Sequence, residues 1–192
     1  MPVHIIVAAT IQISWLVFLV YWIVAAFRVN RMRKPEPAAR RLVYLLLIAV
    51  SLILFNADPR YFGPLNRRFV HRSFWIAFAG TLLTVAGIAF AIWARNHIGR
   101  FWSGSVAIRE DHQLIRSGPY SRIRHPIYTG ILVALAGTTL AVGNYRALLA
   151  FVLILVSLIY KARLEEALLT REFGTAFDDH RRHTGFFLPR VS

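Results

Sequence analysis

Residues 127–160 read IYTGILVALAGTTLAV, then GNYR, then ALLAFVLILVSLIY. Two uncharged apolar runs, Ile127–Val142 and Ala147–Tyr160, are thus separated only by Gly143-Asn144-Tyr145-Arg146. Glycine and asparagine allow the left-handed backbone that a tight turn needs. The stretch therefore predicts a hairpin of two helices. Each helix is short for a bilayer crossing, so we expect neighbouring protein to cover their ends.

Three more apolar runs lie upstream of this hairpin. They are His4–Phe27, Leu42–Asn56 and Ser73–Ala94, and a bilayer crossing needs about 20 apolar residues. The run from Leu42 is rather short for a complete crossing. We predict an all-α polytopic membrane bundle of about five transmembrane helices. It forms one domain, with two N-terminal spans in residues 1–74 and the functional core in residues 75–192.

The composition also indicates a membrane protein. The 192 residues are 57% hydrophobic and 17% charged, whereas a soluble domain carries about 25% charged residues. A chain of this length cannot bury so much apolar surface in a water-soluble core. The formal charge of +14 would suggest nucleic acid if the chain were soluble. Because the basic residues lie between the apolar runs, where they meet anionic headgroups, we predict the lipid bilayer and not nucleic acid as the partner.

The distribution of basic residues predicts the orientation in the membrane. Five spans put the two termini on opposite sides, and an external N-terminus leaves 18 Lys and Arg residues inside and 5 outside. The positive-inside rule favours this arrangement. Two long segments, Arg95–Arg124 and Lys161–Ser192, then share the cytoplasmic side with the C-terminus. A long loop is uncommon unless it is functional, so we expect the active site on that side.

The most informative segment runs from Leu114 to Gly130 and reads LIRSGPYSRIRHPIYTG. Pro126 suits a first helical position, and the residue before a proline is biased away from the helix. His125 is therefore expected at the start of the fourth span, at the water–lipid boundary. A polar ligand can satisfy the backbone groups that such a break frees. The alternative is that His125 and the nearby arginines only anchor a helix end at the headgroups.

Glu165 and Glu166 directly follow the last apolar run. Carboxylates beside a membrane are costly unless they are paired. Neighbouring residues on a helix point about 100° apart, so at most one of the two is expected to face a pocket squarely. That carboxylate would suit ribose hydroxyls or an amino group, and the other would pair with Arg163 or a headgroup-facing cation. A solvated helix next to the membrane is the alternative.

Two further segments flank these motifs. Gly99 is expected to cap the third span and Trp102 to anchor it at the interface. The aromatic and basic tail, Phe173–Pro189, either closes over a cytoplasmic cleft or lies on the membrane surface. His180 and His183 have the spacing of metal ligands, but no third ligand is evident, so we predict no metal. The absence of cysteine excludes disulfides and cysteine nucleophiles, and no dinucleotide-binding or phosphate-binding loop is present.

In order and spacing, these pieces resemble the isoprenylcysteine carboxyl methyltransferase family and its phospholipid N-methyltransferase relatives. The resemblance covers roughly residues 75 to 190. Its elements are Gly99 with Trp102-Ser103, Leu114 to Tyr120, Arg124-His125-Pro126-Ile127-Tyr128-Thr129-Gly130, Glu165-Glu166, and Phe173-Gly174 with Phe177. The family's tail commonly carries tyrosines after Phe-Gly, whereas this chain has Phe177 and then His180.

The resemblance implies a methyltransferase that uses S-adenosylmethionine and releases S-adenosylhomocysteine. The cofactor would lie in a cytoplasm-facing pocket, and the methyl acceptor would arrive laterally from the bilayer. Methyl transfer from a sulfonium needs positioning and desolvation more than covalent help. The residues implied for cofactor binding are Leu114, Tyr120, His125, Pro126, Tyr128, Gly130, Glu165 and Glu166.

Arg122, Arg124 and Glu165 are the candidate catalytic residues, because arginines can hold a carboxylate or phosphate of the acceptor by bidentate contacts. The favoured acceptor is a lipophilic carboxylate of the isoprenylcysteine type. A phospholipid amine is the first alternative. A membrane reductase that uses NADPH and a membrane protein without enzymatic activity are alternatives of other classes.

Overall fold

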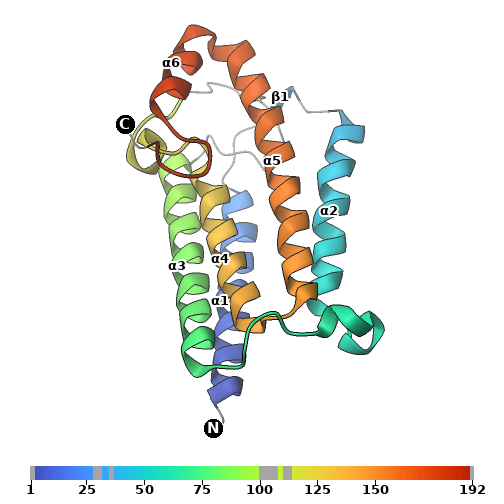
Figure 1. Cartoon of the computed structure of the whole chain (residues 1–192). Helices are drawn as coiled ribbons and strands as arrows, with labels where there is room; N and C mark the ends of the chain where they lie inside the picture. Colours follow the sequence, from blue (N-terminus) through green and yellow to red (C-terminus); the bar gives the residue numbers. More distant parts are fainter. Residues whose placement is uncertain (1–2, 28–31, 35–36, 100–107, 110–113, 191–192) are drawn as a thin grey trace.

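The computed structural model describes residues 3–27, 32–34, 37–99, 108–109 and 114–190. Its long helices form a bundle (Figure 1), which confirms the predicted all-α membrane fold. They are α1 (Val3–Ala26), α2 (Ala38–Asn56), α3 (Phe74–Ile98), α4 (Pro126–Val142) and α5 (Tyr145–Phe173). The connections and the tail contain η1 (Pro59–Asn66), η3 (Gly118–Ser121), α6 (Thr175–His183) and an antiparallel pair of short strands, β1 (Met32–Lys34) and β2 (Ile108–Arg109).

Among the described residues, four helices are long and apolar enough to cross a membrane, namely α1, α2, α3 and α5. The fourth predicted span, α4, has 17 residues and is shorter, as its sequence indicates. Helix α2 begins at Ala38, ahead of the predicted run, and so reaches 19 residues. Arg40 and Arg41 are exposed on its first turn. Such long side chains can extend to the headgroups, so they do not prevent a crossing.

The helices place the two ends of the chain at opposite ends of the bundle (Figure 1). Helix α3 packs along α4 and α1, and α2 packs along α5. The pairing of β1 with β2 joins the first and third connections at one end, where α6 and the C-terminal tail also lie. The described parts of the two long segments predicted to share one side of the membrane therefore lie at one end of the protein.

Glycines bring α3 and α4 into backbone contact. A Cβ atom on Gly87 of α3 would lie 2.4 Å from the backbone nitrogen of Ala134 on α4. A Cβ atom on Gly130 would lie 2.6 Å from the backbone nitrogen of Ala91. Small residues at such contacts are how membrane helices approach closely. The contact fixes the start of α4 beside the last turns of α3.

The predicted hairpin is confirmed, with its turn at Gly143 and Asn144. Gly143 has a φ of 68°, and the Asn144 side chain accepts a hydrogen bond from the backbone nitrogen of Ala147, which caps α5. The second connection covers this turn: Phe69 N donates to Gly143 O over 3.0 Å, and Arg68 Nη1 donates to Val142 O over 2.7 Å. Neighbouring protein thus covers the turn of the hairpin. The first arm, α4, is short as predicted, whereas the prediction of a short second arm is wrong, because α5 continues to Phe173.

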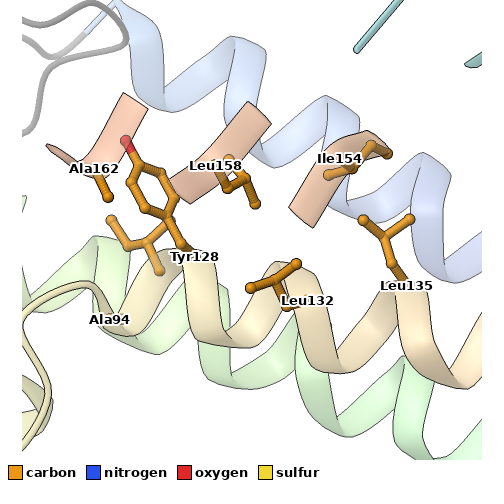
Figure 2. Close-up of a cluster of buried hydrophobic side chains, with 8 residues drawn as sticks. Ala94, Tyr128, Leu132, Leu135, Ile154, Leu158 and Ala162 are labelled. Carbon is orange, nitrogen blue, oxygen red and sulfur yellow. The ribbon is translucent and has the colours of Figure 1, made fainter. Parts of the chain in front are cut away.

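A layer of apolar side chains fills the space between α4 and α5 (Figure 2). Tyr128, Leu132 and Leu135 of α4 meet Ile154 and Leu158 of α5 in this layer. Helix α5 continues without a break for 29 residues. Such a helix is about 44 Å long, which exceeds the roughly 30 Å of hydrocarbon in a bilayer. The last turns of α5, with their glutamates, therefore extend past the apolar layer.

We predict that the α3–α4 contact limits the stability of the bundle. Gly87→Leu inserts a side chain into backbone atoms and should destabilise the protein by at least about 1–3 kcal/mol, the usual cost of overpacking. Ala86→Leu is the matched control, because Ala86 is exposed on the same turn of α3. Thermal unfolding in detergent should show a lower Tm for Gly87→Leu alone. Equal Tm values for the two variants would contradict the prediction that the close contact between α3 and α4 limits stability.

Candidate active site

Main-chain hydrogen bonds join the segment before α4 to the C-terminal tail. Gly185 N donates to Arg122 O over 3.0 Å, and Arg124 N donates to Gly185 O over 2.9 Å. His125 N donates to Phe186 O over 3.2 Å. The tail therefore runs directly across the start of α4, although the two segments are far apart in the sequence.

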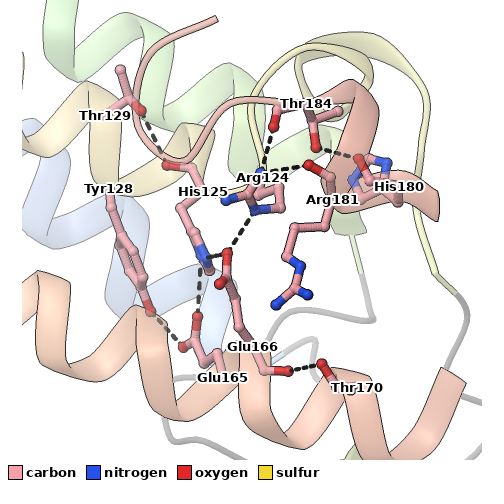
Figure 3. Close-up of polar contacts among 10 residues, drawn as sticks. All are labelled: Arg124, His125, Tyr128, Thr129, Glu165, Glu166, Thr170, His180, Arg181 and Thr184. Atoms are coloured by element: carbon pink, nitrogen blue, oxygen red, sulfur yellow. Dashed lines mark hydrogen bonds and ion pairs between the residues drawn. The ribbon is translucent and has the colours of Figure 1, made fainter. Parts of the chain in front are cut away.

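Helix α5 brings two carboxylates to this crossing (Figure 3). Glu166 accepts a hydrogen bond from Arg124 Nε over 2.6 Å, and the same oxygen lies 3.3 Å from His125 Nε2. Glu165 Oε2 lies 3.6 Å from His125 Nδ1, and Oε1 accepts a hydrogen bond from the Tyr128 hydroxyl. The imidazole of His125 thus stands between two carboxylates. We refer to Arg124, His125, Tyr128, Glu165 and Glu166 as the polar cluster.

The two carboxylates are arranged differently from the sequence-based expectation. Both Glu165 and Glu166 point toward His125, and Glu166 pairs with Arg124, whereas the sequence favours one inward carboxylate and a pair with Arg163 or a headgroup-facing cation. The guanidinium of Arg163 instead lies 5.0 Å from the centre of an aromatic ring in the tail. Each glutamate side chain has two methylenes, so two residues that leave the helix in different directions can still converge on one ring.

The polar cluster is largely buried. The side chains of His125 and Glu166 are each 6% exposed, whereas that of Glu165 is 22% exposed. Burial lowers the pKa of His125, but its contacts with Glu165 and Glu166 outweigh burial and hold that pKa above the ordinary value of 6.5. The charged imidazole therefore stabilises the fold fully below about pH 6.5, and this contribution is lost as the pH rises through the raised folded-state pKa.

Aromatic side chains cover the imidazole. The ring of Tyr128 is stacked on that of His125, with centroids 5.6 Å apart and an interplanar angle of 7°. Phe186 meets the same imidazole edge-on at 5.0 Å. The Thr129 hydroxyl donates to Phe187 O over 2.6 Å, which holds the second phenylalanine of the tail in place. The tail thus closes one side of the cluster, as the first of the two sequence interpretations predicts.

The loop before α4 is fixed against the end of α3. The Tyr120 side chain is buried, and its ring stacks on His97 with centroids 6.3 Å apart. His97 Nε2 lies 2.9 Å from the Ser117 hydroxyl. Burial, together with the charge of Glu165, raises the pKa of Tyr120, so its hydroxyl stays protonated. Trp102 and Ser103, which the sequence analysis includes in the motif, lie outside the described residues.

The structure brings most of the predicted site residues together. Arg124, His125, Tyr128, Glu165 and Glu166 form the polar cluster, and Pro126 follows His125 as the first residue of α4. Tyr120 is buried in the preceding loop, and Leu114 is half-buried at the beginning of that loop.

Two predicted residues have other surroundings. Gly130 lies in the close contact between α4 and α3, against Gly87 and Ala91. The Arg122 side chain is exposed, and the contact that links Arg122 to the tail is made by its backbone carbonyl. The sequence motif therefore includes residues that position the helices as well as residues of the cluster.

Lys161 is a residue near the cluster that the sequence motifs do not identify. This residue is buried in α5, and its Nζ lies 5.5 Å from the centre of the Tyr128 ring and 5.4 Å from that of Tyr44. The available signal was the four-residue spacing between Lys161 and Glu165, which puts the two side chains on one face of a helix.

The donor set fits a polar organic ligand. Carboxylates accept hydrogen bonds from hydroxyl and ammonium groups, and Glu165 is the more exposed of the pair. Among the residues that the structure describes, no group of three or more His, Cys, Asp or Glu side chains is arranged to hold a metal ion. His180 is buried beside Phe177, and burial and the charges of Arg116 and Arg124 lower its pKa.

Residues 80–171 match the sequence model of the isoprenylcysteine carboxyl methyltransferase family. The match includes all of α4 and the whole polar cluster. The chain is 34% identical over 121 residues to the nickel-cobalt-cadmium resistance protein NccN of Alcaligenes xylosoxydans xylosoxydans, covering 62% of this chain and 54% of that protein. It is 31% identical over 96 residues to the protein-S-isoprenylcysteine O-methyltransferase of Schizosaccharomyces pombe, covering 48% of this chain and 41% of that protein.

The fold is similar to a solved membrane enzyme. The structure of the eukaryotic intramembrane Ras methyltransferase, isoprenylcysteine carboxyl methyltransferase, superposes with a TM-score of 0.56 at 24% sequence identity. The similarity covers 77% of this chain and 52% of that one. This chain spans about half the length of these curated relatives.

Proposed function

We propose that this chain, whose residues 80–171 match the isoprenylcysteine carboxyl methyltransferase family, belongs to that family and transfers a methyl group from S-adenosylmethionine to a lipophilic acceptor. The observation that carries the proposal is the polar cluster. It joins the start of α4 to the end of α5, where two membrane helices leave the apolar layer. A soluble methyl donor and a membrane-bound acceptor can meet at such a boundary.

The residues of the chain would bind and orient the methyl donor. Bound S-adenosylmethionine supplies a methyl group on a sulfonium that is already activated for transfer. Glu165 is suited to accept hydrogen bonds from its hydroxyl or ammonium groups, and the loop from Leu114 to Tyr120 offers backbone groups. His125 and Tyr128 would line the site and hold Glu165 in position. The same contacts keep water away from the reacting groups.

The protonation state of His125 favours a carboxylate acceptor over an amine. An amine must lose a proton before it attacks, whereas a carboxylate is already ionised at neutral pH. Because the two glutamates hold the pKa of His125 above its ordinary value, its imidazole is less available as a base. We therefore propose a lipophilic carboxylate of the isoprenylcysteine type as the acceptor. A phospholipid amine remains the alternative within the same family of reactions.

We also propose that the cluster faces the cytoplasm and the N-terminus faces outside. The paired strands β1 and β2, which belong to the first and third connections, lie with the tail at the end of the bundle that holds the cluster. In the sequence, these two connections and the tail carry 18 of the 23 basic residues. Such an excess is typical of the cytoplasmic side. In this arrangement residues 1–74 provide two additional spans, and residues 75–192 form the core that binds the cofactor.

Binding of S-adenosylhomocysteine to the detergent-purified protein tests the cofactor. We expect saturable binding in calorimetry, and about tenfold or greater weakening in Glu165→Gln and His125→Ala, because each loses a charge-assisted contact worth about 1.5–3 kcal/mol. Glu172→Gln is the matched control, since Glu172 is an exposed glutamate on the same helix. A folded, monodisperse wild-type protein that does not bind would reject the proposal and make NADPH the next ligand to test.

The chemistry of the product identifies the acceptor. We expect methyl-labelled S-adenosylmethionine to label a farnesylcysteine derivative with a blocked amine, and mild base to release that label as methanol. This result follows because a methyl ester hydrolyses in base whereas an N-methyl group does not. Labelling of phosphatidylethanolamine with a base-stable product would instead support the amine alternative.

Single cysteines test the orientation, because the natural chain has none. Tyr61→Cys and Thr175→Cys place one thiol at each end of the bundle, both at exposed positions. In spheroplasts of a bacterial host, a membrane-impermeant maleimide should label Tyr61→Cys before lysis and Thr175→Cys only after it. The opposite pattern would reverse the assigned sides.

A further inference from the structure

Lys161 is an unusual residue for its position. The chain uses arginine at 21 of its 23 basic positions, and Lys161 is one of two lysines. It lies in α5 one turn before Glu165, on the side of the apolar layer, and it is buried. Its Nζ lies 5.4 Å from the ring centre of Tyr44 on α2 and 5.5 Å from that of Tyr128 on α4. A buried ionisable group inside a membrane helix is costly and by default indicates a functional site.

The other cations near the cluster are used differently. Arg122 and Arg163 are exposed, and the guanidinium of Arg163 covers a ring of the tail. Arg124 is bonded to Glu166 and to backbone carbonyls of the tail. Lys161 lies one turn before Glu165, on the membrane side of the carboxylates, and its charge acts on Glu165. Its ammonium lies where three helices meet.

The position of Lys161 matches the direction from which the acceptor would come. Four residues of helix correspond to about 6 Å, so Lys161 lies about one turn deeper in the membrane than Glu165. The reactive carboxylate of a lipophilic acceptor approaches the methyl donor from that side. We propose that Lys161 binds this carboxylate and so selects anionic acceptors over amines, an inference that rests on the proposed function.

The aromatic neighbours explain why the residue is lysine. A compact ammonium can be held between two ring faces by cation–π attraction and still direct its hydrogen atoms to an oxygen ligand. The guanidinium of arginine is larger and planar, so it would not present its hydrogen atoms in the same way. Ser157 donates a hydrogen bond to the backbone carbonyl of Tyr44 over 3.1 Å, which ties α2 to α5 beside Lys161.

Paired acid and carboxamide ligands test the proposal. Wild-type protein should bind a farnesylcysteine acid at least about tenfold more tightly than its carboxamide, as expected for a buried charge pair. The measurements are the KM of the acid and the Ki of the amide. In Lys161→Met and Lys161→Gln this preference should fall to near unity, while the Kd for S-adenosylhomocysteine changes by no more than about twofold. Lys161→Arg should retain part of the preference.

The control is Arg171→Met, which removes an exposed cation from the last turn of the same helix and should change none of these values. An active protein whose uncharged Lys161 variants keep the acid preference would overturn the inference and make Lys161 a brace between α2 and α4. If neither uncharged variant is monodisperse, Lys161→Arg provides the test. An unchanged KM for the acid in Lys161→Arg would also overturn the inference that Lys161 binds the carboxylate. A wild-type protein that binds no S-adenosylhomocysteine would instead reject the underlying function.

Discussion

The guanidinium of Arg124 connects three segments that are distant in the sequence. It precedes α4, donates to Glu166 on α5 over 2.6 Å, and donates to the carbonyls of Arg181 and Thr184 in the tail. Its side chain is 11% exposed and that of Glu166 is 6% exposed. Removing one partner of such a buried pair costs about 3–5 kcal/mol, because the other charge is left uncompensated. The position of the tail and the direction of Glu166 therefore depend on one another.

The rest of the bundle determines where this connection lies. Backbone contact at Gly87 and Gly130 fixes the position of α4 along the axis of α3. The hairpin turn at Gly143 fixes the position of α5 along the axis of α4. Because α5 is longer than its partner in the hairpin, it carries Glu165 past the apolar layer. The carboxylates and the imidazole are then held by their contacts with Arg124 and Tyr128. Precise positioning of this kind is what a methyl transfer requires.

The sequence predicts the features that depend on local composition. The apolar runs, the hairpin and the break at Pro126 follow from the order of apolar residues, glycine and proline. His125, Glu165 and Glu166 follow from the spacing of a motif. The start of α2 is less predictable, because exposed arginines at a helix end can extend to the headgroups and lengthen a span. The end of α3 depends on packing, because Arg95 is buried there and donates hydrogen bonds to the carbonyls of Ala25 and Gly99.

Features that depend on long-range packing cannot be read from the sequence. Glu166 pairs with Arg124 and not with Arg163, because the fold brings the segment before α4 across α5. Gly130 belongs to the motif by position, and only the approach of α3 explains why a side chain would not fit there. Lys161 looks like one more basic residue after an apolar run until Tyr44 and Tyr128 are seen on either side of its ammonium.

The short length of α4 determines which measure of acceptor concentration matters for the protein. A helix of 17 residues is about 26 Å long, less than the roughly 30 Å of hydrocarbon in a bilayer. Its first residues, and the cluster around them, therefore lie close to the depth at which lipid chains meet their headgroups. The proposed acceptor, anchored in the bilayer, would carry its reactive end at that same depth. How often the acceptor meets the protein would then depend on the mole fraction of the acceptor in the lipid. Adding water around the membrane does not change that mole fraction.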